Sequence, residues 1–321
     1  MHSKVTLLVF LVTISAVPLK ELENSSRMNL FNLINISQTT QSTIDYLRDN
    51  NLLYTYYLCC GIRCHLINDS HTTDGQMFRC ANRECRKKFS IRTDSFWTNS
   101  KLPLRVLLIL TYLFSVGTSV KEAMAHLDTK ANKKTIIQWF EYCRDICTWY
   151  LDENPISFQG NVALQIDETA VGGKRKYNRG RVRQVPDWLF GIIDPESKRV
   201  HIQFVDNRQV RTLLPIIRER VPAGMTIHSD EAAFYKCLRR AGYRHRTVKH
   251  KEEFVSQDGT HTQNIENFWS HVKYMVKKVK GSSSEMLRSH LDEFSYRWNR
   301  KHEGQVYNLM IDDLIQMYPL H

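Results

Sequence analysis

The sequence predicts an α/β protein in which a cysteine-rich ribbon and a helical region precede a mixed β-sheet flanked by helices. Three observations support this prediction. Five cysteines lie within residues 59–85, apolar residues recur at helical spacing over residues 102–151, and apolar and polar residues alternate from residue 161 onward. A chain of 321 residues is long enough for two or three domains that each bury a core.

The charge balance indicates an anionic partner. The formal net charge is +12 and the sequence pI is about 9.3. A hydrophobic content of 42% with 11% aromatic residues argues against a disordered chain. Basic residues cluster in segments that also carry acidic residues able to bind a metal ion, discussed below. This favours nucleic acid over a membrane surface as the partner.

Residues 1–27 give a conflicting indication of localisation. Lys4 and the apolar run VTLLVFLVTISAV resemble a secretory signal peptide, and the run is too short to span a membrane comfortably. Either this leader is real, or it is an upstream extension of a protein that starts at Met28. The cysteine cluster and the basic charge favour Met28 and a nuclear protein, whereas secretion predicts glycan on Asn35 or Asn68.

The two ends of the remaining chain show no residues that indicate chemistry. Residues 28–55 predict a helical packing segment with one amphipathic helix near residues 43–48. Residues 301–321 predict a tail with at most one short helix.

Residues 56–98 predict a zinc ribbon, in which two closely spaced pairs of cysteines supply four soft ligands to Zn²⁺. The predicted ligands are Cys60, Cys64, Cys80 and Cys85. Cys59 is an alternative to Cys60, and five buried or free thiols are the alternative to a metal site. Arginines and lysines between these cysteines favour a ribbon that lies on a phosphate backbone.

Residues 99–155 predict three helices with short connections. Ser119 and Asn132 are suitable N-caps for the second and third helices. The third helix begins with Lys133 and Lys134, which suits a helix-turn-helix whose last helix enters the major groove of DNA. A helical linker bundle is the alternative interpretation.

Residues 156–300 predict the α/β domain. The expected order is strand, hairpin, helix, strand, helix, strand and helix, which gives a mixed sheet flanked by helices and matches the ribonuclease H-like fold. The predicted elements are a strand that ends on Asp167, a hairpin around residues 194–198, helices at 211–220, 232–241 and 259–280, and strands at 225–228 and 243–248.

Asp167, Asp230 and Glu266 are the predicted catalytic acids. Phosphoryl transfer with two Mg²⁺ or Mn²⁺ ions needs hard oxygen ligands that hold the metals about 3.5–4 Å apart. Spacing alone is weak support, because the chain has 33 acidic residues. Glu231 or a simple helix cap competes with the assignment of Asp230, and an exposed helical glutamate is ordinary.

Basic residues near these acids are predicted to bind DNA. They are Lys174, Arg175, Lys176, Arg179 and Arg181 in one glycine-bordered segment, Lys133 and Lys134 in the helical region, and Lys273 on the last helix. Trp269 has two interpretations, a platform for an unpaired base or a core aromatic residue.

Several blocks of sequence resemble the transposase domain of Merlin-type DNA transposons and their bacterial ISXO-like relatives. These blocks occur in family order between about residues 28 and 300: RCANRECRKKFSIRTDSFW, LQIDETAVGGKRKYNRGR, WLFGIID, IHSDEAAFY, GYRH and THTQNIENFWSHVK. HSDE followed by THTQNIENFW is more specific than the three acids alone. Two departures are the irregular CCGIRC of the first knuckle and Gln165, which stands where an acid is common. The leader lies outside the family pattern.

The resemblance implies a DDE transposase that cuts at terminal inverted repeats and joins the freed 3′-hydroxyl to target DNA. In that family the three metal-binding acids fall on Asp167, Asp230 and Glu266. Two DNA ends must be joined, so a homodimer or larger assembly is expected, with no membrane partner. A domesticated DNA-binding protein that no longer cuts, a structure-specific nuclease and a secreted protein are the alternatives.

Overall fold

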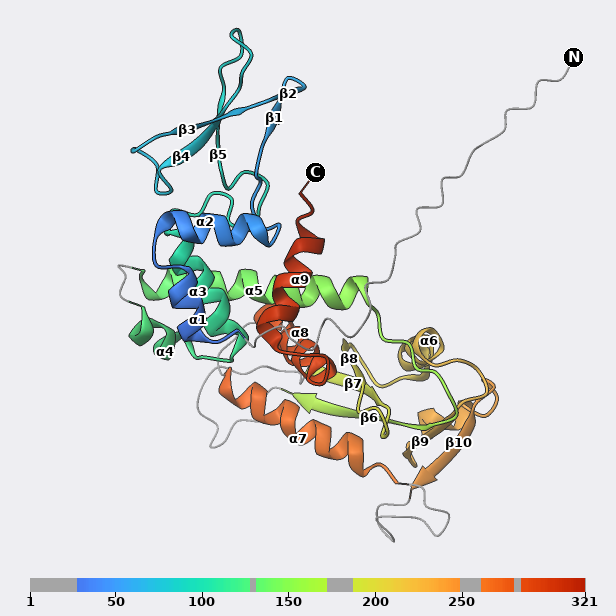
Figure 1. Cartoon of the computed structure of the whole chain (residues 1–321). Coiled ribbons are helices and arrows are strands. Elements are labelled where there is room, and N and C mark those ends of the chain that lie inside the picture. Colours follow the sequence, from blue (N-terminus) through green and yellow to red (C-terminus); the bar gives the residue numbers. More distant parts are fainter. Residues whose placement is uncertain (1–27, 128–130, 172–186, 249–260, 280–283, 321) are drawn as a thin grey trace, which may run out of the picture.

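The computed structural model describes residues 28–127, 131–171, 187–248, 261–279 and 284–320. Figure 1 shows small strands at one end of the molecule, a cluster of helices in the middle and a larger sheet at the other end. Among the described helices, none is long and apolar enough to cross a membrane. The leader 1–27 and the basic residues Lys174, Arg175, Lys176, Arg179 and Arg181 lie outside the described residues.

The larger sheet has five strands in the order β10-β9-β6-β7-β8. Only β7 runs against the others, because β6 and β8 pair with it antiparallel while β9 pairs parallel with β6 and β10. This order and these directions are those of the ribonuclease H-like fold, as predicted. The strands are β6 (Ala163–Val171), β7 (Asp187–Ile193), β8 (Val200–Val205), β9 (Thr226–Asp230) and β10 (Arg244–Val248).

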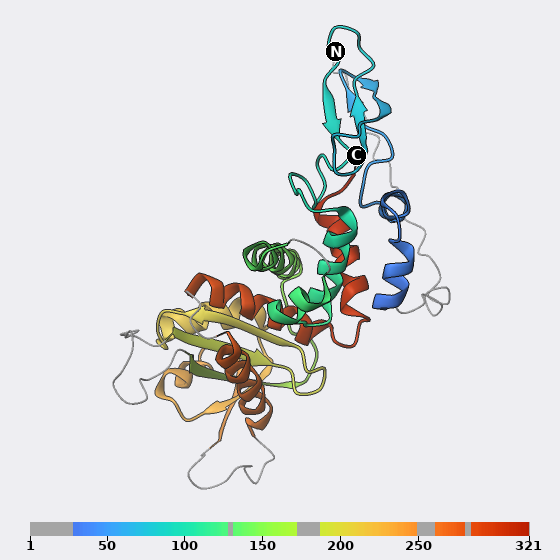
Figure 2. The same ribbon diagram turned by 90° about the vertical axis from the view of Figure 1, so that its left-hand side faces the viewer.

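Helices cover both faces of this sheet, and each face therefore buries its own set of side chains. Leu164 and Ile166 of β6 point to the face that packs on α6 (Val210–Arg220). The alternate residues of β6 point to the opposite face, which packs on α7 (Gln263–Lys278) and α8 (Ser284–Arg300). Figures 1 and 2 show α7 lying along the sheet.

Two predicted elements differ from the structure. Strand β6 does not end on Asp167, because the antiparallel ladder with β7 continues as far as the pair Val171 and Asp187. The predicted helix at 232–241 is only the 3₁₀-helix η2 (Ala233–Cys237). Tyr235 and Leu238 are both buried at a spacing of three residues, which matches the 3₁₀ repeat.

The helical cluster has one continuous core that includes both ends of the described chain. Residues 306–317, within the predicted tail, form a helix that buries Tyr307 and Met310 against the others. The three helices predicted at 102–151 are present, and Ser119 and Asn132 cap the second and third. The helices are α1 (Leu30–Ile36), α2 (Thr40–Asp49), α3 (Leu104–Ser115), α4 (Val120–His126), α5 (Lys133–Glu153) and α9 (Val306–Met317).

The cysteine-rich region forms a hairpin and a three-stranded antiparallel sheet. A buried ion pair joins this region to the start of α3, because Arg92 donates to both carboxylate oxygens of Asp74 at 2.6 Å and also to the carbonyl oxygens of Ser100 and Leu102. The strands are β1 (Leu58–Cys59), β2 (Ile62–Arg63), β3 (His65–Asn68), β4 (Gln76–Arg79) and β5 (Lys88–Ser90).

Asp74→Asn should lower the free energy of unfolding by about 3–5 kcal/mol, because it leaves the buried Arg92 charge uncompensated. The measurement is urea unfolding followed by tryptophan fluorescence. Asp69→Asn is the control, since Asp69 pairs with the exposed Lys88 and should have a much smaller effect. Equal losses in the two variants would contradict the structural role of the buried pair.

Candidate active site

The register of two parallel strands brings Asp167 and Asp230 together. β6 pairs with β9 at an offset of 63 residues, ending at the pair Gln165 and His228. Extending the two strands by two residues each sets Asp167 beside Asp230, and side chains at paired positions point to the same face. The pKa of Asp167 responds to the charge of Asp230, which is consistent with their proximity.

Helix α7 brings Glu266 to the same face of the sheet. Two backbone N–H groups of its first turn, those of Asn264 and Ile265, donate to Oε1 of Gln165 at 3.0 and 3.2 Å. The hydroxyl of Thr262 donates to Oε1 of Glu266 at 3.0 Å. Gln165 on β6 therefore holds the end of the helix that carries the third acid. The sequence identified Gln165 only as a departure from the family pattern.

Trp269 is a core residue that orients Asp167. Its side chain is 3% exposed, and its Nε1–H donates to Oδ2 of Asp167 at 3.0 Å. Gly191 on β7 pairs with Asp167 and makes room for the indole, because a Cβ at this position would lie 2.7 Å from two ring carbons of Trp269. The core interpretation of Trp269 is therefore confirmed.

The charges of the other two acids act on Asp167. Its pKa is raised to about 6, mainly by burial and also by the negative charges of Asp230 and Glu266, against the lowering effects of the Glu168 backbone N–H and of Trp269. Among the described residues, no three carboxylates approach one another within 4.8 Å as four of the cysteines do. The charges of Asp230 and Glu266 nevertheless act on Asp167, and a cation between them would reduce this repulsion.

Glu168 is a partly buried acid next to Asp167 that the sequence did not single out. It points to the opposite face of β6 from Asp167, where the hydroxyl of Tyr235 donates to it. The pKa of Glu168 is raised to about 8, mainly by burial and also by the charges of Asp167 and Asp230, while Arg208 opposes this shift. Its position directly after Asp167, in the block LQIDET, was the available signal.

Three of the residues predicted to bind DNA lie within the described chain, and all three are exposed on helix surfaces. Lys273 lies on α7 two turns after Glu266 and on the same helical face. Lys133 and Lys134 are exposed at the start of α5. Both positions are accessible to a phosphate backbone.

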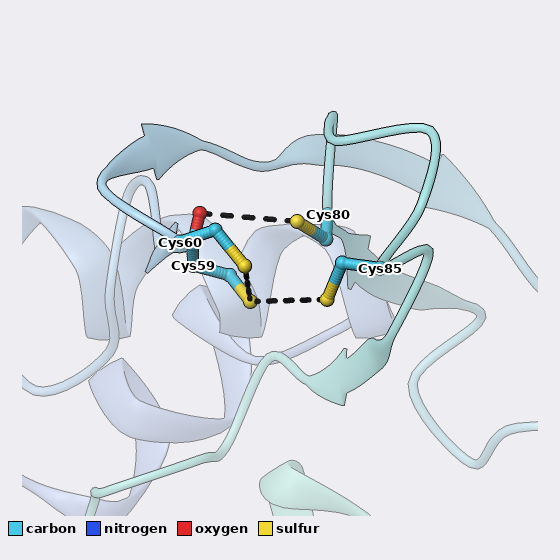
Figure 3. A group of neighbouring side chains, drawn as sticks. All are labelled: Cys59, Cys60, Cys80 and Cys85. Atoms are coloured by element: carbon cyan, nitrogen blue, oxygen red, sulfur yellow. Dashed lines mark hydrogen bonds between the residues drawn. The ribbon is translucent and has the colours of Figure 1, made fainter.

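Four cysteine side chains converge where the turn of the β1–β2 hairpin faces the loop between β4 and β5 (Figure 3). Their sulfur atoms lie within 4.8 Å of one another, and the four are Cys59, Cys60, Cys80 and Cys85. This group differs from the predicted ligand set, because Cys59 is included and Cys64 is not. The reason is the left-handed backbone at Cys60, with φ 55°, which turns both neighbouring cysteines toward the second pair.

The chemistry of this cysteine group suits Zn²⁺. Four thiol sulfurs are the donor set of a closed structural site, and a thiolate is the form that binds. The backbone N–H of Lys87 lowers the pKa of Cys85 to about 7, so the thiolate forms readily near neutral pH. All eight cysteines of the chain, including Cys64 beside this group, have free thiols.

Two sequence comparisons agree with the geometry of the acids. Residues 158–299 match the family described as the ISXO2-like transposase domain. A Haemophilus influenzae protein named "Uncharacterized transposase-like protein" is 32% identical over 101 residues, which are 32% of this chain and 81% of that protein. The chain belongs to the ISXO2-like transposase family. The matched residues contain all three acids, Gln165 and Trp269.

Solved structures with a similar arrangement are retroviral integrases. The HTLV-2 integrase catalytic core domain in complex with magnesium has a TM-score of 0.32 at 12% identity, covering 48% of this chain and 98% of that one. The catalytic core domain of BIV integrase has a TM-score of 0.30 at 14% identity, covering 50% and 99%. Both scores are below 0.5, so the family assignment of this transposase depends on the sequence matches.

Trp269→Phe should raise the pKa of Asp167 above about 6, because the variant lacks the indole N–H that stabilises the carboxylate. Carboxyl ¹³C NMR with labelled aspartate measures this pKa directly. Trp298→Phe is the matched control, since the Trp298 indole donates to the carbonyl oxygen of Lys198 and not to an acid. An unchanged pKa of Asp167 in Trp269→Phe would show that the indole does not orient this carboxylate.

Proposed function

We propose that this protein is a DDE transposase that binds terminal inverted repeats and cleaves and joins DNA by metal-dependent phosphoryl transfer. The observation that carries the proposal is the parallel register of β6 and β9, which matches Asp167 with Asp230 when it is extended by two residues. Gln165 of β6 bonds the first turn of α7, the helix that carries Glu266. Membership of the ISXO2-like transposase family supports the same reaction class. The eukaryotic Merlin type and a nuclear site of action are part of this proposal.

The donor set fits two Mg²⁺ or Mn²⁺ ions. Carboxylate oxygens are the hard ligands that these cations prefer. The negative charges of Asp230 and Glu266 raise the pKa of Asp167, and a bound cation would offset this repulsion. We assign Asp167, Asp230 and Glu266 as the ligands. When bound, the ions supply activation of the attacking oxygen and stabilisation of the leaving oxygen.

The protein's own groups orient these acids. Asp167 receives the indole N–H of Trp269, and Glu266 receives the hydroxyl of Thr262. Oδ1 of Asp230 receives the backbone N–H of Ala232 at 3.0 Å. Each carboxylate therefore has one oxygen held by a neutral donor, which restricts its rotation before any substrate arrives.

DNA binding is assigned to exposed basic residues. Lys273, Lys133 and Lys134 are candidates within the described chain, and their charge would contribute affinity for phosphates rather than sequence choice. We extend the assignment to the basic segment containing Lys174, Arg175, Lys176, Arg179 and Arg181. Since two transposon ends are joined, the working form is proposed to be a homodimer or a larger assembly.

Replacing any of Asp167, Asp230 or Glu266 by alanine should lower cleavage of inverted-repeat DNA by about 1,000-fold or more, because several kcal/mol of transition-state stabilisation depends on the metals. DNA binding should be retained. The assay uses protein starting at Met28 with the repeats that flank the gene, in Mg²⁺ or Mn²⁺. Wild-type cleavage should also need more metal as the pH falls below about 6, because protons then compete for Asp167.

Glu231→Ala is the matched control for that assay, since Glu231 is an exposed acid next to Asp230. It should cut like the wild type. Loss of cutting in Glu231→Ala with normal cutting in Asp230→Ala would show that Glu231, and not Asp230, is the second metal ligand. Binding of the repeats by the wild type without cutting in either metal would favour the domesticated DNA-binding protein.

Cys80→Ser should lower zinc content and DNA binding together, if the cysteine group is a structural zinc site that holds the ribbon. Zinc is measured by mass spectrometry of the purified protein and binding by anisotropy. Cys59→Ser should have the same effect, whereas Cys64→Ser and Cys237→Ser should retain zinc. Full zinc content in Cys80→Ser would exclude this site.

A further inference from the structure

We propose that Gln165 is a positioning residue that sets where α7, and therefore Glu266, lies relative to Asp167. This inference rests on the proposed function, because it concerns the same site. It goes beyond the catalytic acids themselves: Gln165 binds no metal and acts through the first turn of a helix.

Helix α7 lacks a side-chain cap of its own. Its N-cap residue, Thr262, has φ −121° and ψ 14°, and its side chain does not cap the helix. The first turn of a helix leaves backbone N–H groups without intrahelical partners, and buried ones need an acceptor. Oε1 of Gln165 accepts from two of these groups, those of Asn264 and Ile265. A strand residue 99 positions away thus replaces the local cap.

Gln165 forms one hydrogen-bonded link between α7 and β6. A second is the bond from Trp269 to Asp167. Two residues of a strand span about 6.6 Å, and the four to five residues from the capped N–H groups to Trp269 rise about 6–7.5 Å along a helix. The spacings match, so the two links together fix how far α7 slides and how it rotates over the strand.

The amide suits this position for two reasons. Gln165 is 1% exposed, so an uncharged acceptor avoids the cost of burying another negative charge beside Asp167. Its Nε2 lies 3.3 Å from Nδ1 of His261, so the amide contacts the residue just before the helix as well as the helix itself. A side chain of equal length without polar atoms would leave two buried N–H groups unsatisfied.

The test compares Gln165→Met, Gln165→Glu and the wild type, each as protein that starts at Met28. Methionine keeps the length of the side chain and removes the acceptor, whereas glutamate retains the acceptor oxygen. Cleavage is measured as a function of Mn²⁺ concentration, and amide hydrogen exchange of Asn264 and Ile265 is measured without metal. Gln203→Met is the matched control, because Gln203 is a partly buried glutamine on β8 that bonds His201.

Gln165→Met should raise the Mn²⁺ concentration for half-maximal cleavage by about 10-fold to 100-fold, the range typical of residues that orient metal ligands. Amide hydrogen exchange at Asn264 and Ile265 should become at least about 10-fold faster, because the variant lacks the Oε1 acceptor that protects both N–H groups. DNA affinity should not change. Gln165→Glu should keep amide exchange slow and should need a Mn²⁺ concentration for half-maximal cleavage close to that of the wild type. Gln203→Met should resemble the wild type in both measurements.

Two results would overturn the inference. One is wild-type metal dependence and wild-type exchange in Gln165→Met. The other is a defect in Gln165→Met that Gln165→Glu does not correct, which would indicate general packing rather than helix capping. If the wild type itself does not cut, the proposed function fails, and the exchange rates still decide whether Gln165 holds α7.

Discussion

The placement of α7 on the five-stranded sheet is the constraint on which the candidate site depends. Asp167 and Asp230 each lie in a strand ladder, paired with Gly191 and Val248, whereas Glu266 lies on a helix that packs through apolar residues such as Phe268. Hydrophobic attraction has no direction, so an apolar stripe alone leaves a helix able to slide. The hydrogen bonds of Gln165 and Trp269 fix the position of α7 along β6 and its rotation about its own axis.

Charge is distributed so that the acidic residues of the sheet and the exposed basic residues lie on different parts of the domain. Asp167 and Glu168 are successive residues on opposite faces of β6, and burial raises the pKa of both. Lys273 is exposed on the same helix that carries Glu266. Buried acids favour binding of small cations, and exposed lysines contribute long-range attraction for a polyanion. A net charge of +12 therefore coexists with a negative site.

The helical cluster ties the cysteine-rich ribbon to the sheet. On the sheet side, Arg144 of α5 donates to Ser289 of α8 at 3.1 Å, and Arg297 of α8 donates to the carbonyl oxygen of Ser115 at the end of α3. On the ribbon side, Arg92 joins the cysteine-rich strands to the residues that precede α3. These directional contacts, together with the shared core, connect the cysteine-rich ribbon through the helices to the sheet domain.

Local pattern was enough to predict the order of elements along the sheet domain and the helices at 102–151, because alternation, helical spacing and caps such as Asn132 are properties of neighbouring residues. The assignment of the three acids stays a prediction. Local pattern was not enough for the cysteine group, where a left-handed backbone at Cys60 brought in Cys59. Nor did it show the role of Gln165 or the burial of α9, since each depends on contacts with residues far away in the chain. The sequence by itself determined which side chains are chemically able to act, and only the tertiary structure decided which of them meet, because long-range contacts have no local periodicity.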